Sequence, residues 1–529
     1  MQARSVGLVG KMRAIAPTGT DTGAPTGALT GTGAIKVSCD HDHVIIYTQN
    51  ASAFASIEAR YTHSEYDRFA DRTRVRKLFH ANKRLGKITL PIGYLNNLIY
   101  WVVSTTPYKI ELDDSAKTRD TGLPIIEKWH EILDTNFHMI GGKTQYDNLK
   151  LLTSKSRSLG QLYTGYGKTE LALAIVESYL EQYDGKVVIL VPTSKIRDEF
   201  LERAKKWDVA EPLEYAKFQS RVQLINPMGF ARSKAFLDLS DEIRDYFNQT
   251  GLILIDEVHH LSAASYRAVI EKIPNYRFIY GMSGTVDASE GETPDDRFRP
   301  NDLTYNYNLV LGYFGAPRMV VRNPKYLLVT YLRFMAETED VPEEIKSDYR
   351  LSIRRFFQSE RLVPMLGSLL ERCPDRRVFI PTNEIDIGKN LVDRFNEYMG
   401  EGTAISVSAN EIYPPLPEGY TDLKDYLRRS KFRIICGTTA LYEGFDSDRI
   451  NTVFLAVGKA QRMTIQPIGR GVRSDDLPLV IFPYDTSRKL PIINSQTKNR
   501  YRKLQSEYSN CQYIDFEDLT SASTSNRST

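Results

Sequence analysis

Beyond about residue 120, the chain repeats one pattern of hydrophobic and polar positions. A short, continuous apolar run ends in a polar or glycine-rich turn, and a stretch with helical spacing of apolar residues follows. Such runs fit parallel strands that are covered on both faces and alternate with helices. They read KVVILVPT (186–193), GLILIDE (251–257), RFIYGMSGT (277–285), RRVFIPTN (376–383), FRIICGT (432–438), NTVFLAVG (451–458) and LVIFPYD (479–485). The pattern predicts an α/β fold with two tandem, doubly wound parallel-sheet domains, whose ligands sit at the carboxyl ends of the strands.

The pattern changes toward both ends of the chain. Residues 17–34 are almost entirely Gly, Thr, Ala, Pro and Asp and have no periodic apolar face, so they cannot offset the entropy of ordering. Short segments such as VIIYT (44–48) instead indicate a small mixed α+β accessory domain. The expected organisation is a flexible arm over 1–35, the accessory domain over 36–118, the parallel-sheet domains over 119–322 and 323–515, and a flexible tail over 516–529.

Composition and charge exclude several classes of protein. Apolar residues make up 41% and charged residues 26% of the 529 positions, so neither wholesale disorder nor a fibrous repeat is indicated. The four cysteines form no CxxC pair, which argues against a zinc site or disulfide framework and favours a reducing, cytoplasmic setting. No stretch has the roughly 20 apolar residues of a membrane helix. The formal charge is +3, from 69 basic and 66 acidic residues, so a nucleic-acid partner would have to be held by local patches.

The segment TGYGKTE is a candidate phosphate-binding loop. Gly165 and Gly167 allow a tight turn whose backbone N–H groups can point at phosphate oxygens. Lys168 adds a positive charge for the β- and γ-phosphates, and the Thr169 hydroxyl can bind Mg²⁺. Leu162 stands where the strict GxxxxGK[ST] pattern has glycine, so an ordinary strand–loop–helix turn is the alternative.

A second candidate is the acidic pair that ends the apolar run LILIDEVHH. Asp256 can hold the Mg²⁺ that bridges β- and γ-phosphates, and Glu257 can orient and deprotonate the attacking water. For a lone DE pair, a solvated acidic turn would be the commoner explanation. Together with an upstream lysine loop, the pair is what one ATPase core requires.

Two further loops carry weaker candidates at strand ends. In GMSGT, Ser283 and Thr285 can relay between nucleotide and substrate, although a generic turn explains the segment equally well. In CGTTALYEGFD, the hydroxyl of Thr438 and backbone amides could hold nucleic-acid phosphates, while Asp446 could sense the nucleotide. Structural turn residues are the alternative there.

The segment QPIGRGVR (466–473) places basic residues at helical spacing. Gln466, Gly469, Arg470 and Arg473 lie three or four residues apart and would share one helix face. Two guanidinium groups on one face could stabilise charge on a transferring phosphoryl group. A solvated basic face is the alternative.

The ordered set of motifs resembles superfamily 2 helicases and translocases. TGYGKT, VPTSK, DEVH, SGT, VFIPTN, GTTALYEGFD and QPIGRGVR follow one another in the order seen in that superfamily, over about residues 140–475. The DEVH box, the SGT turn followed by NLVLGYFGAP (308–317) and the EGFD loop look most like phage recombination helicases of the UvsW type and the related XPB/RecG-like DNA translocases. Tyr163, where many relatives have proline, and SGT in place of the commoner Ser-Ala-Thr depart from the pattern without removing a catalytic atom.

The resemblance implies two RecA-like domains with ATP and Mg²⁺ in the cleft between them. It implies Lys168 and Thr169 on the ATP–Mg²⁺, Asp256 on the metal and Glu257 as the base. Gln145 resembles an upstream glutamine that contacts adenine in many members. The other implied roles are Gln466 near the γ-phosphate, Arg470 and Arg473 as arginine fingers, Asp446 at the nucleotide, and Thr193, Ser283, Thr285, Thr382 and Thr438 in nucleic-acid contact or coupling.

A basic stretch in the accessory domain is a candidate grip on nucleic acid. RTRVRKLFHANKRLGK (72–87) holds seven basic residues, Arg76 and Lys77 among them, and no acidic one. Binding of phosphates by such a stretch would be salt-sensitive. A solvated helix face is the alternative.

Taken together, the residues and the resemblance predict an ATP-dependent helicase or translocase that acts on nucleic acid. DNA is favoured through the resemblance, with recombination or replication intermediates as substrates and proteins of those processes as possible partners. A monomer away from membranes is expected. The alternatives are an ATP-driven remodeller or regulator that displaces proteins without separating strands, an RNA helicase, and a nucleic-acid-binding module with a dead ATPase.

Overall fold

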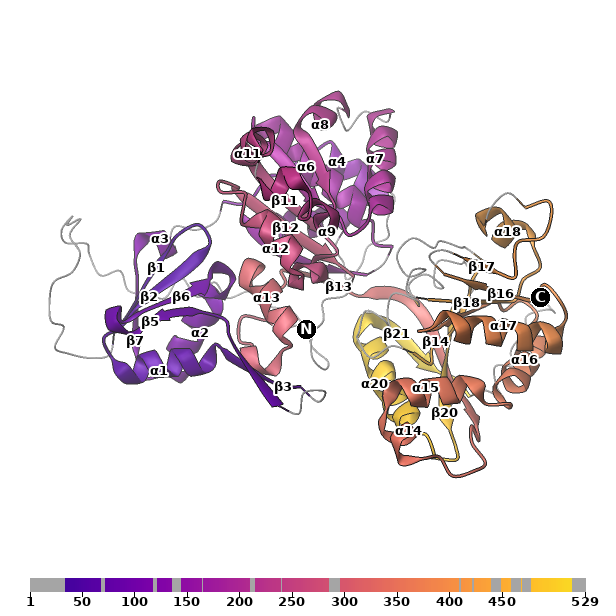
Figure 1. Cartoon of the computed structure of the whole chain (residues 1–529). Helices are drawn as coiled ribbons and strands as arrows, with labels where there is room; N and C mark the ends of the chain where they lie inside the picture. The colour runs from indigo at the N-terminus through magenta and orange to yellow at the C-terminus, as the bar shows by residue number, and fades with distance from the viewer. Residues whose placement is uncertain are drawn as a thin grey trace, which may run out of the picture.

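The computed structural model confirms an α/β fold built on two large parallel sheets and a small N-terminal sheet (Figure 1). It describes residues 34–67, 72–117, 121–135, 144–163, 165–209, 215–238, 240–284, 295–408, 411–420, 423–438, 449–457, 468 and 477–515. Within these ranges, no helix is long and apolar enough to cross a membrane.

The N-terminal sheet is mixed and five described strands form it, in the order β5-β6-β2-β1-β7. β1 and β7 are parallel, and the other neighbours are antiparallel. A separate two-stranded ribbon, β3–β4, extends from this part of the molecule to lie below α13 in Figure 1. The bounds are β1 Ala34–Cys39, β2 His43–Tyr47, α1 Ala51–Arg60, β3 Thr62–Asp67, β4 Arg72–Lys77, β5 His80–Asn82, η2 Lys83–Leu85, β6 Lys87–Pro91, η3 Ile92–Tyr94, α2 Leu95–Thr105, β7 Lys109–Leu112 and α3 Asp114–Lys117.

The first parallel sheet has six described strands in the order β10-β9-β11-β12-β8-β13, and every neighbouring pair is parallel. The strands are β8 Arg157–Leu162, β9 Lys186–Leu190, β10 Val222–Ile225, β11 Thr250–Asp256, β12 Phe278–Ser283 and β13 Met319–Val321. Around them lie α4 Trp129–Thr135, α5 Gln145–Leu152, α6 Lys168–Gln182, α7 Ser194–Val209, α8 Tyr215–Arg221, α9 Pro227–Phe230, α10 Lys234–Leu237, α11 Asp241–Asn248, η4 Val258–Ser262, α12 Ala264–Ile270, η5 Pro300–Asp302 and α13 Tyr305–Phe314.

Alternate residues of these strands enter two different cores, as a sheet covered on both faces requires. In β11, Leu252 and Leu254 belong to one core, whereas Ile253 and Ile255 belong to the other. The second of these cores continues without a break into the N-terminal sheet, because α13 packs against η3. The two sheets therefore share buried apolar surface.

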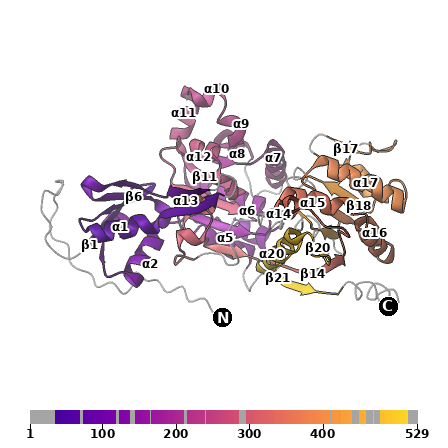
Figure 2. The ribbon, with the colours of Figure 1, turned by 60° about the horizontal axis from the view of Figure 1, so that its bottom comes forward.

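The second parallel sheet has eight described strands in the order β17-β16-β18-β15-β19-β20-β14-β21, of which only the β16–β17 pair is antiparallel. Figure 2 shows it beside the first sheet, on the side away from the N-terminal sheet. Its elements are β14 Asn323–Phe334, α14 Glu343–Ser347, α15 Tyr349–Gln358, α16 Leu362–Arg372, β15 Val378–Pro381, α17 Ile385–Met399, β16 Ala404–Val407, β17 Ile412–Tyr413, α18 Leu423–Arg429, β18 Ile434–Gly437, β19 Thr452–Phe454, β20 Leu479–Asp485, α20 Pro491–Glu507 and β21 Tyr508–Tyr513.

All seven apolar runs of the sequence contain a strand of one of the parallel sheets. One expectation at the N-terminus is wrong for two residues: Ala34 and Ile35, which we assigned to a flexible arm, belong to β1, and Ile35 is fully buried. Residues 1–33 and 516–529 lie outside the described residues, and the domain limits remain predictions.

Candidate nucleotide site

The predicted phosphate loop connects β8 to α6 at the carboxyl edge of the first sheet. Gly165 and Gly167 both have left-handed backbone conformations, with φ of 94° and 85°, which glycine adopts without a steric penalty. Gly165 is exposed, and a side-chain carbon built there would meet nothing within 4 Å. α6 begins at Lys168, so its free N–H groups and the positive end of its dipole face the same space. The loop has room and donors for phosphate.

The acidic pair lies next to this loop because β11 ends where α6 begins. The Lys168 Nζ atom is 2.5 Å from Glu257 Oε1. Asp256 is the last residue of β11, and one of its carboxylate oxygens accepts a hydrogen bond of 3.0 Å from the Glu257 N–H. Glu257 has φ of 50°, a left-handed conformation that costs a residue other than glycine about 1–3 kcal/mol. Such strain is typical of a functional position.

Two further side chains hold the Glu257 carboxylate. The Ser283 hydroxyl, at the end of β12, donates a hydrogen bond of 2.9 Å to Glu257 Oε2. His259 Nδ1 lies 3.0 Å from Ser283 Oγ and 3.4 Å from Glu257 Oε2. Ser283 and His259 therefore fix the orientation of the carboxylate that faces the phosphate loop.

The two adjacent carboxyl groups have pKa values shifted in opposite directions. Burial raises the pKa of Asp256, and the negative charge of Glu257 raises it further. Burial alone would raise the pKa of Glu257 too, but the Lys168 ammonium and His259 outweigh it and hold this pKa well below its usual range. Glu257 is thus ionised, whereas Asp256 has no ion pair with a described residue. A divalent cation at Asp256 would supply the missing positive charge.

Gln145 is the first residue of α5 and approaches the loop from the side. Its side chain is 2% exposed, and its Nε2 donates a hydrogen bond of 2.5 Å to the Tyr166 carbonyl oxygen. Its Oε1 is buried and has no partner among the described residues. A buried acceptor without a donor is costly, and the exocyclic amino group of adenine could satisfy it. Together with the hard oxygen atoms of Thr169 and Asp256, the described residues fit ATP and Mg²⁺.

The threonines expected to contact nucleic acid lie at strand ends of both parallel sheets. Thr193 follows β9 and caps α7, its hydroxyl accepting a hydrogen bond of 3.2 Å from the Ile196 N–H. Thr382 and Thr438 follow the neighbouring strands β15 and β18, and the Thr382 N–H donates a 2.7 Å hydrogen bond to the Gly437 carbonyl. Thr382 and Thr438 are thus brought to one edge of the second sheet.

Five predicted site residues cannot be placed in this geometry. They lie outside the described residues: Thr285, Asp446, Gln466, Arg470 and Arg473. Their roles remain predictions.

The basic stretch 72–87 forms strands β4 and β5, the short 3₁₀ helix η2 and the start of β6, and no α-helix. The strand register puts the acidic position Glu65 opposite Arg74 and Asp67 opposite Arg72. The Arg76 guanidinium lies 4.2 Å from the centre of the Tyr305 ring and so joins the ribbon to α13, whereas Lys77 is exposed. At the base of the ribbon, by contrast, Arg76 faces His63 and Lys77 faces Thr62, neither of which carries a carboxylate.

The sequence reasoning assigned no role to His259, although it lies two residues after the catalytic Glu257 candidate. The signal was present in the DEVH box itself, since a histidine after a strand-end carboxylate can reach the next strand. Tyr166 was also missed. Its carbonyl binds Gln145, and its hydroxyl accepts a 2.9 Å hydrogen bond from Asn148 Nδ2.

Two parallel α/β sheets, with a phosphate loop and an acidic pair at the edge of the first, define the class of motor ATPases. Residues 123–288 match the family described as "Type III restriction enzyme, res subunit". The chain is 24% identical to the ATP-dependent DNA helicase uvsW of Enterobacteria phage T4, over 65% of this chain and 68% of the relative. A protein named as a helicase, from Sulfolobus islandicus filamentous virus, is 22% identical over 65% of this chain and 63% of its own length. In this family match and in these relatives, the chain is similar to superfamily 2 helicases.

One further relative and one solved structure also have low sequence identity to this chain. A protein named as an ATP-dependent RNA helicase, from Acanthamoeba polyphaga mimivirus, is 22% identical over 67% of this chain and 65% of that relative. The crystal structure of T4 UvsW aligns with a TM-score of 0.40 at 18% identity, over 91% of this chain and 99% of that chain. The chain thus spans somewhat less than two thirds of the length of some of the relatives that it matches.

Proposed function

We propose that this protein is an ATP-dependent DNA helicase or translocase that unwinds or branch-migrates recombination and replication intermediates. The observation that carries the proposal is the contact between Lys168 and Glu257, which puts a phosphate-binding lysine and a candidate general base at one sheet edge. The T4 relative named as a DNA helicase supports DNA as the substrate.

In the proposed reaction, Lys168 exchanges its ion pair with Glu257 for the β- and γ-phosphates. This exchange frees the Glu257 carboxylate to accept a proton from the attacking water, while Ser283 and His259 keep the carboxylate oriented. Thr169 and Asp256 would hold Mg²⁺, which would neutralise charge on the phosphates when bound. Gln145 recognises adenine through its unsatisfied Oε1.

The second parallel sheet supplies the other half of the proposed motor. Arg470 and Arg473 act as arginine fingers, with Gln466 near the γ-phosphate and Asp446 at the nucleotide. Thr193, Thr382 and Thr438, at strand ends of the two sheets, bind phosphates of the nucleic-acid track, and Ser283 with Thr285 couples the track to the nucleotide. The cleft between the two parallel-sheet domains closes when ATP binds and opens after hydrolysis, and this cycle moves the protein along the nucleic acid.

RNA is the second candidate substrate, because one relative is named as an RNA helicase. The test is steady-state ATP hydrolysis by the full chain with single-stranded, duplex or branched DNA or with RNA, using Lys168→Ala as the blank. Stimulation strongest with branched DNA and absent in the variant is the expected result, followed by strand displacement on a forked substrate. Hydrolysis that no nucleic acid stimulates would overturn the proposal.

A further inference from the structure

A cleft of about 690 Å³ opens where the N-terminal sheet domain meets the segment that precedes α13. α2 provides Tyr100 and Trp101 on one side, and the end of α1 provides Arg60. The opposite side is the segment around η5, with Arg297, Arg299 and Asp302. The volume lies within the usual range of ligand sites, about 300–1,000 Å³. This site, the junction cleft, is separate from the nucleotide site.

The floor of the junction cleft is held by hydrogen bonds between the two domains. The Arg60 guanidinium donates to the Phe298 carbonyl at 2.9 Å and to Asn97 Oδ1 at 3.3 Å. The Asn97 amide donates in turn to the Phe298 carbonyl at 2.8 Å. Arg60 also lies 5.0 Å from the centre of the Trp101 ring. The indole and the guanidinium are therefore set in place before any ligand arrives.

The rim of the cleft carries cations that are available to a ligand. Arg299 is exposed, and its guanidinium has no ion pair or hydrogen bond with a described residue, although its carbonyl accepts a hydrogen bond of 3.0 Å from the Asp302 N–H. Arg297 pairs with Asp295, but the two side chains are 67% and 53% exposed, so water and salt weaken the pair and a phosphate can replace it. Three arginines line the cleft against one carboxylate, that of Asp302.

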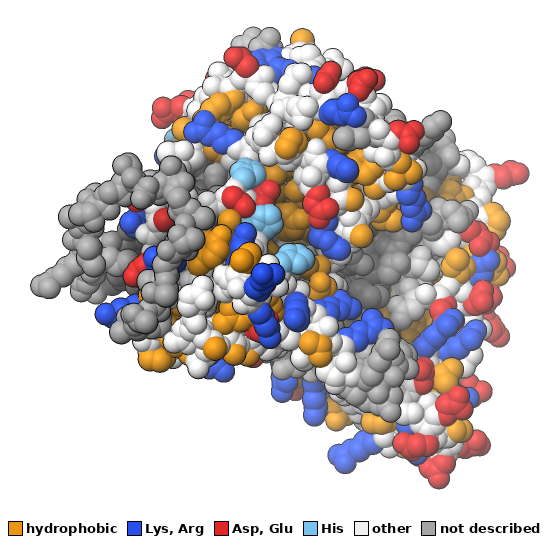
Figure 3. Space-filling view, turned by 60° about the vertical axis from the view of Figure 1, so that its left-hand side comes forward, with side chains coloured by type: hydrophobic (Ala, Val, Ile, Leu, Met, Phe, Trp, Pro, Cys, Tyr) orange, Lys and Arg blue, Asp and Glu red, His pale blue; other side chains and the backbone are white. Residues whose placement is uncertain are grey.

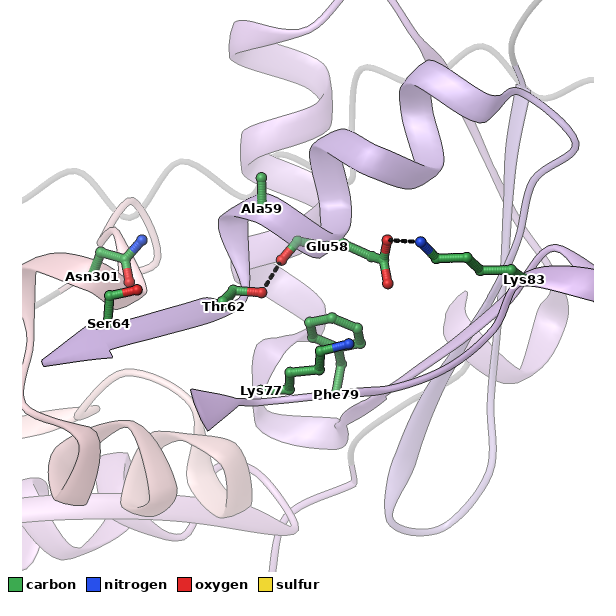
Figure 4. A pocket seen from close by; sticks show the side chains of 8 residues that line it. All are labelled: Glu58, Ala59, Thr62, Ser64, Lys77, Phe79, Lys83 and Asn301. Carbon is green, nitrogen blue, oxygen red and sulfur yellow. Dashed lines mark hydrogen bonds and ion pairs between the residues drawn. The ribbon is translucent and has the colours of Figure 1, made fainter. Parts of the chain in front are cut away.

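A second, smaller hollow of about 430 Å³ adjoins the junction cleft at Asn301, which lines both. Figure 4 shows Lys77 and Lys83 on its walls, with Lys83 3.3 Å from Glu58. Figure 3 shows Lys and Arg side chains gathered across the lower middle of the face that it views. Lys77, which lines this hollow, thus adds a positive charge at the base of the β3–β4 ribbon.

We propose that the junction cleft binds single-stranded nucleic acid outside the two parallel sheets, with one base stacked on Trp101 or Tyr100 and the flanking phosphates on Arg297 and Arg299. Aromatic rings beside arginines are the recurring means of holding single strands without regard to sequence. The proposal rests on the proposed function and gives the motor a second hold on a displaced strand.

The test uses the full chain and a fluorescein-labelled oligothymidylate of 12 nucleotides. The variants are Arg299→Glu, Arg297→Glu and Trp101→Leu, and Arg372→Glu, an exposed arginine of α16, is the matched control. Each cleft variant should weaken binding, measured by anisotropy, by about 5- to 100-fold, as the loss of one stacked base or phosphate contact predicts. Each arginine variant should also flatten the slope of log affinity against log salt by about 0.7, the value for one phosphate contact on a single strand. Basal ATP hydrolysis should stay at the wild-type rate in all four variants.

Two results would overturn the proposal. One is oligonucleotide affinity in all three cleft variants equal to that of Arg372→Glu, while wild type binds. The other is quenching of Trp101 fluorescence by thymidine monophosphate at the concentration at which the oligonucleotide acts, which would make the cleft a mononucleotide site. Failure of wild type itself to bind any nucleic acid would instead contradict the proposed function. Circular dichroism and a thermal unfolding curve show whether each variant is folded.

Discussion

The Glu257 side chain combines a strained backbone with three polar neighbours. Lys168, Ser283 and His259 all contact its carboxylate, and the cost of its left-handed conformation is accepted where a group must be aimed. A carboxylate that served only to neutralise Lys168 would need neither the strained backbone of Glu257 nor its contacts with Ser283 and His259. These contacts support the proposal that Glu257 is the general base, because they hold its carboxylate in one orientation.

The Glu257→Gln substitution tests this role because it keeps the shape and removes the proton acceptor. The rate of ATP hydrolysis should fall by about 10²- to 10⁴-fold, the usual contribution of a general base. Binding of a fluorescent ATP analogue should change by less than a few-fold. Glu371→Gln, at an exposed end of α16, is the control and should leave both quantities unchanged. Hydrolysis within twofold of wild type would show that Glu257 is not the base.

The adenine contact proposed for Gln145 can be tested separately from its structural hydrogen bond to Tyr166. Replacing it with alanine removes the acceptor Oε1 and the hydrogen bond to the Tyr166 carbonyl. We expect the KM for ATP to rise by about 10-fold, the effect of one lost hydrogen bond in a buried site, and the preference for ATP over UTP to shrink equally. An equal rise in KM for both nucleotides would mean that Gln145 only supports the loop.

At the scale of elements, η3 and α13 join the N-terminal sheet to the first parallel sheet. The Tyr94 hydroxyl donates a hydrogen bond of 2.8 Å to the Asn308 carbonyl, and Gly93 lies directly against the last turn of α13. A side-chain carbon at Gly93 would be 2.0 Å from the Leu311 carbonyl oxygen and 2.5 Å from the Gly315 nitrogen. Only glycine permits this approach of two backbones.

Gly93→Ala should therefore force η3 away from α13. Overpacking of this kind costs about 1–3 kcal/mol, and we expect at least that loss in the free energy of unfolding, measured with urea. Gly229→Ala is the control, since a side-chain carbon there meets nothing within 4 Å. Equal stability of the two variants would contradict the packing described for this junction.

The sequence predicted the elements of the motor better than the elements that join its parts. Continuous apolar runs such as GLILIDE became buried strands, and the motifs at their ends came together, as Lys168 and Glu257 show. β8, RSLGQL, was not singled out because arginine, glycine and glutamine interrupt its apolar pattern. The pairing of acidic with basic positions in the β3–β4 ribbon depends on strand register, and the junction cleft depends on residues that are 201 and 238 positions apart along the chain. Neither is visible in a local pattern.

At the scale of the whole molecule, a polar cluster around Asp42, here called the latch, joins the N-terminal sheet to the first parallel sheet next to η3, whose Ile92 N–H donates a hydrogen bond of 2.8 Å to the Asp42 carbonyl. Asp42 accepts hydrogen bonds of 2.9 Å from Arg157 Nη2 and 2.7 Å from the Tyr276 hydroxyl. The Arg157 guanidinium also donates to the His41 carbonyl at 2.6 Å. Arg157 begins β8, the strand that leads into the phosphate loop, so the latch ties the N-terminal sheet to the strand that positions the nucleotide site.

The latch makes a prediction about pH. Burial acts to raise the pKa of Asp42, but Arg157 and the Tyr276 hydroxyl outweigh it and the pKa lies below the ordinary value of 3.8. A lowered folded-state pKa stabilises the protein at any pH above the unfolded pKa, and this stability is lost as the pH falls through the folded pKa. Asp42→Asn should reduce the free energy of unfolding at pH 7 by about 1 kcal/mol, at the low end for a charged hydrogen bond because Asp42 is 46% exposed. The difference between wild type and variant should shrink below pH 4, where wild type too becomes protonated. A difference that stayed constant from pH 7 to pH 3 would mean that the latch does not depend on the Asp42 charge.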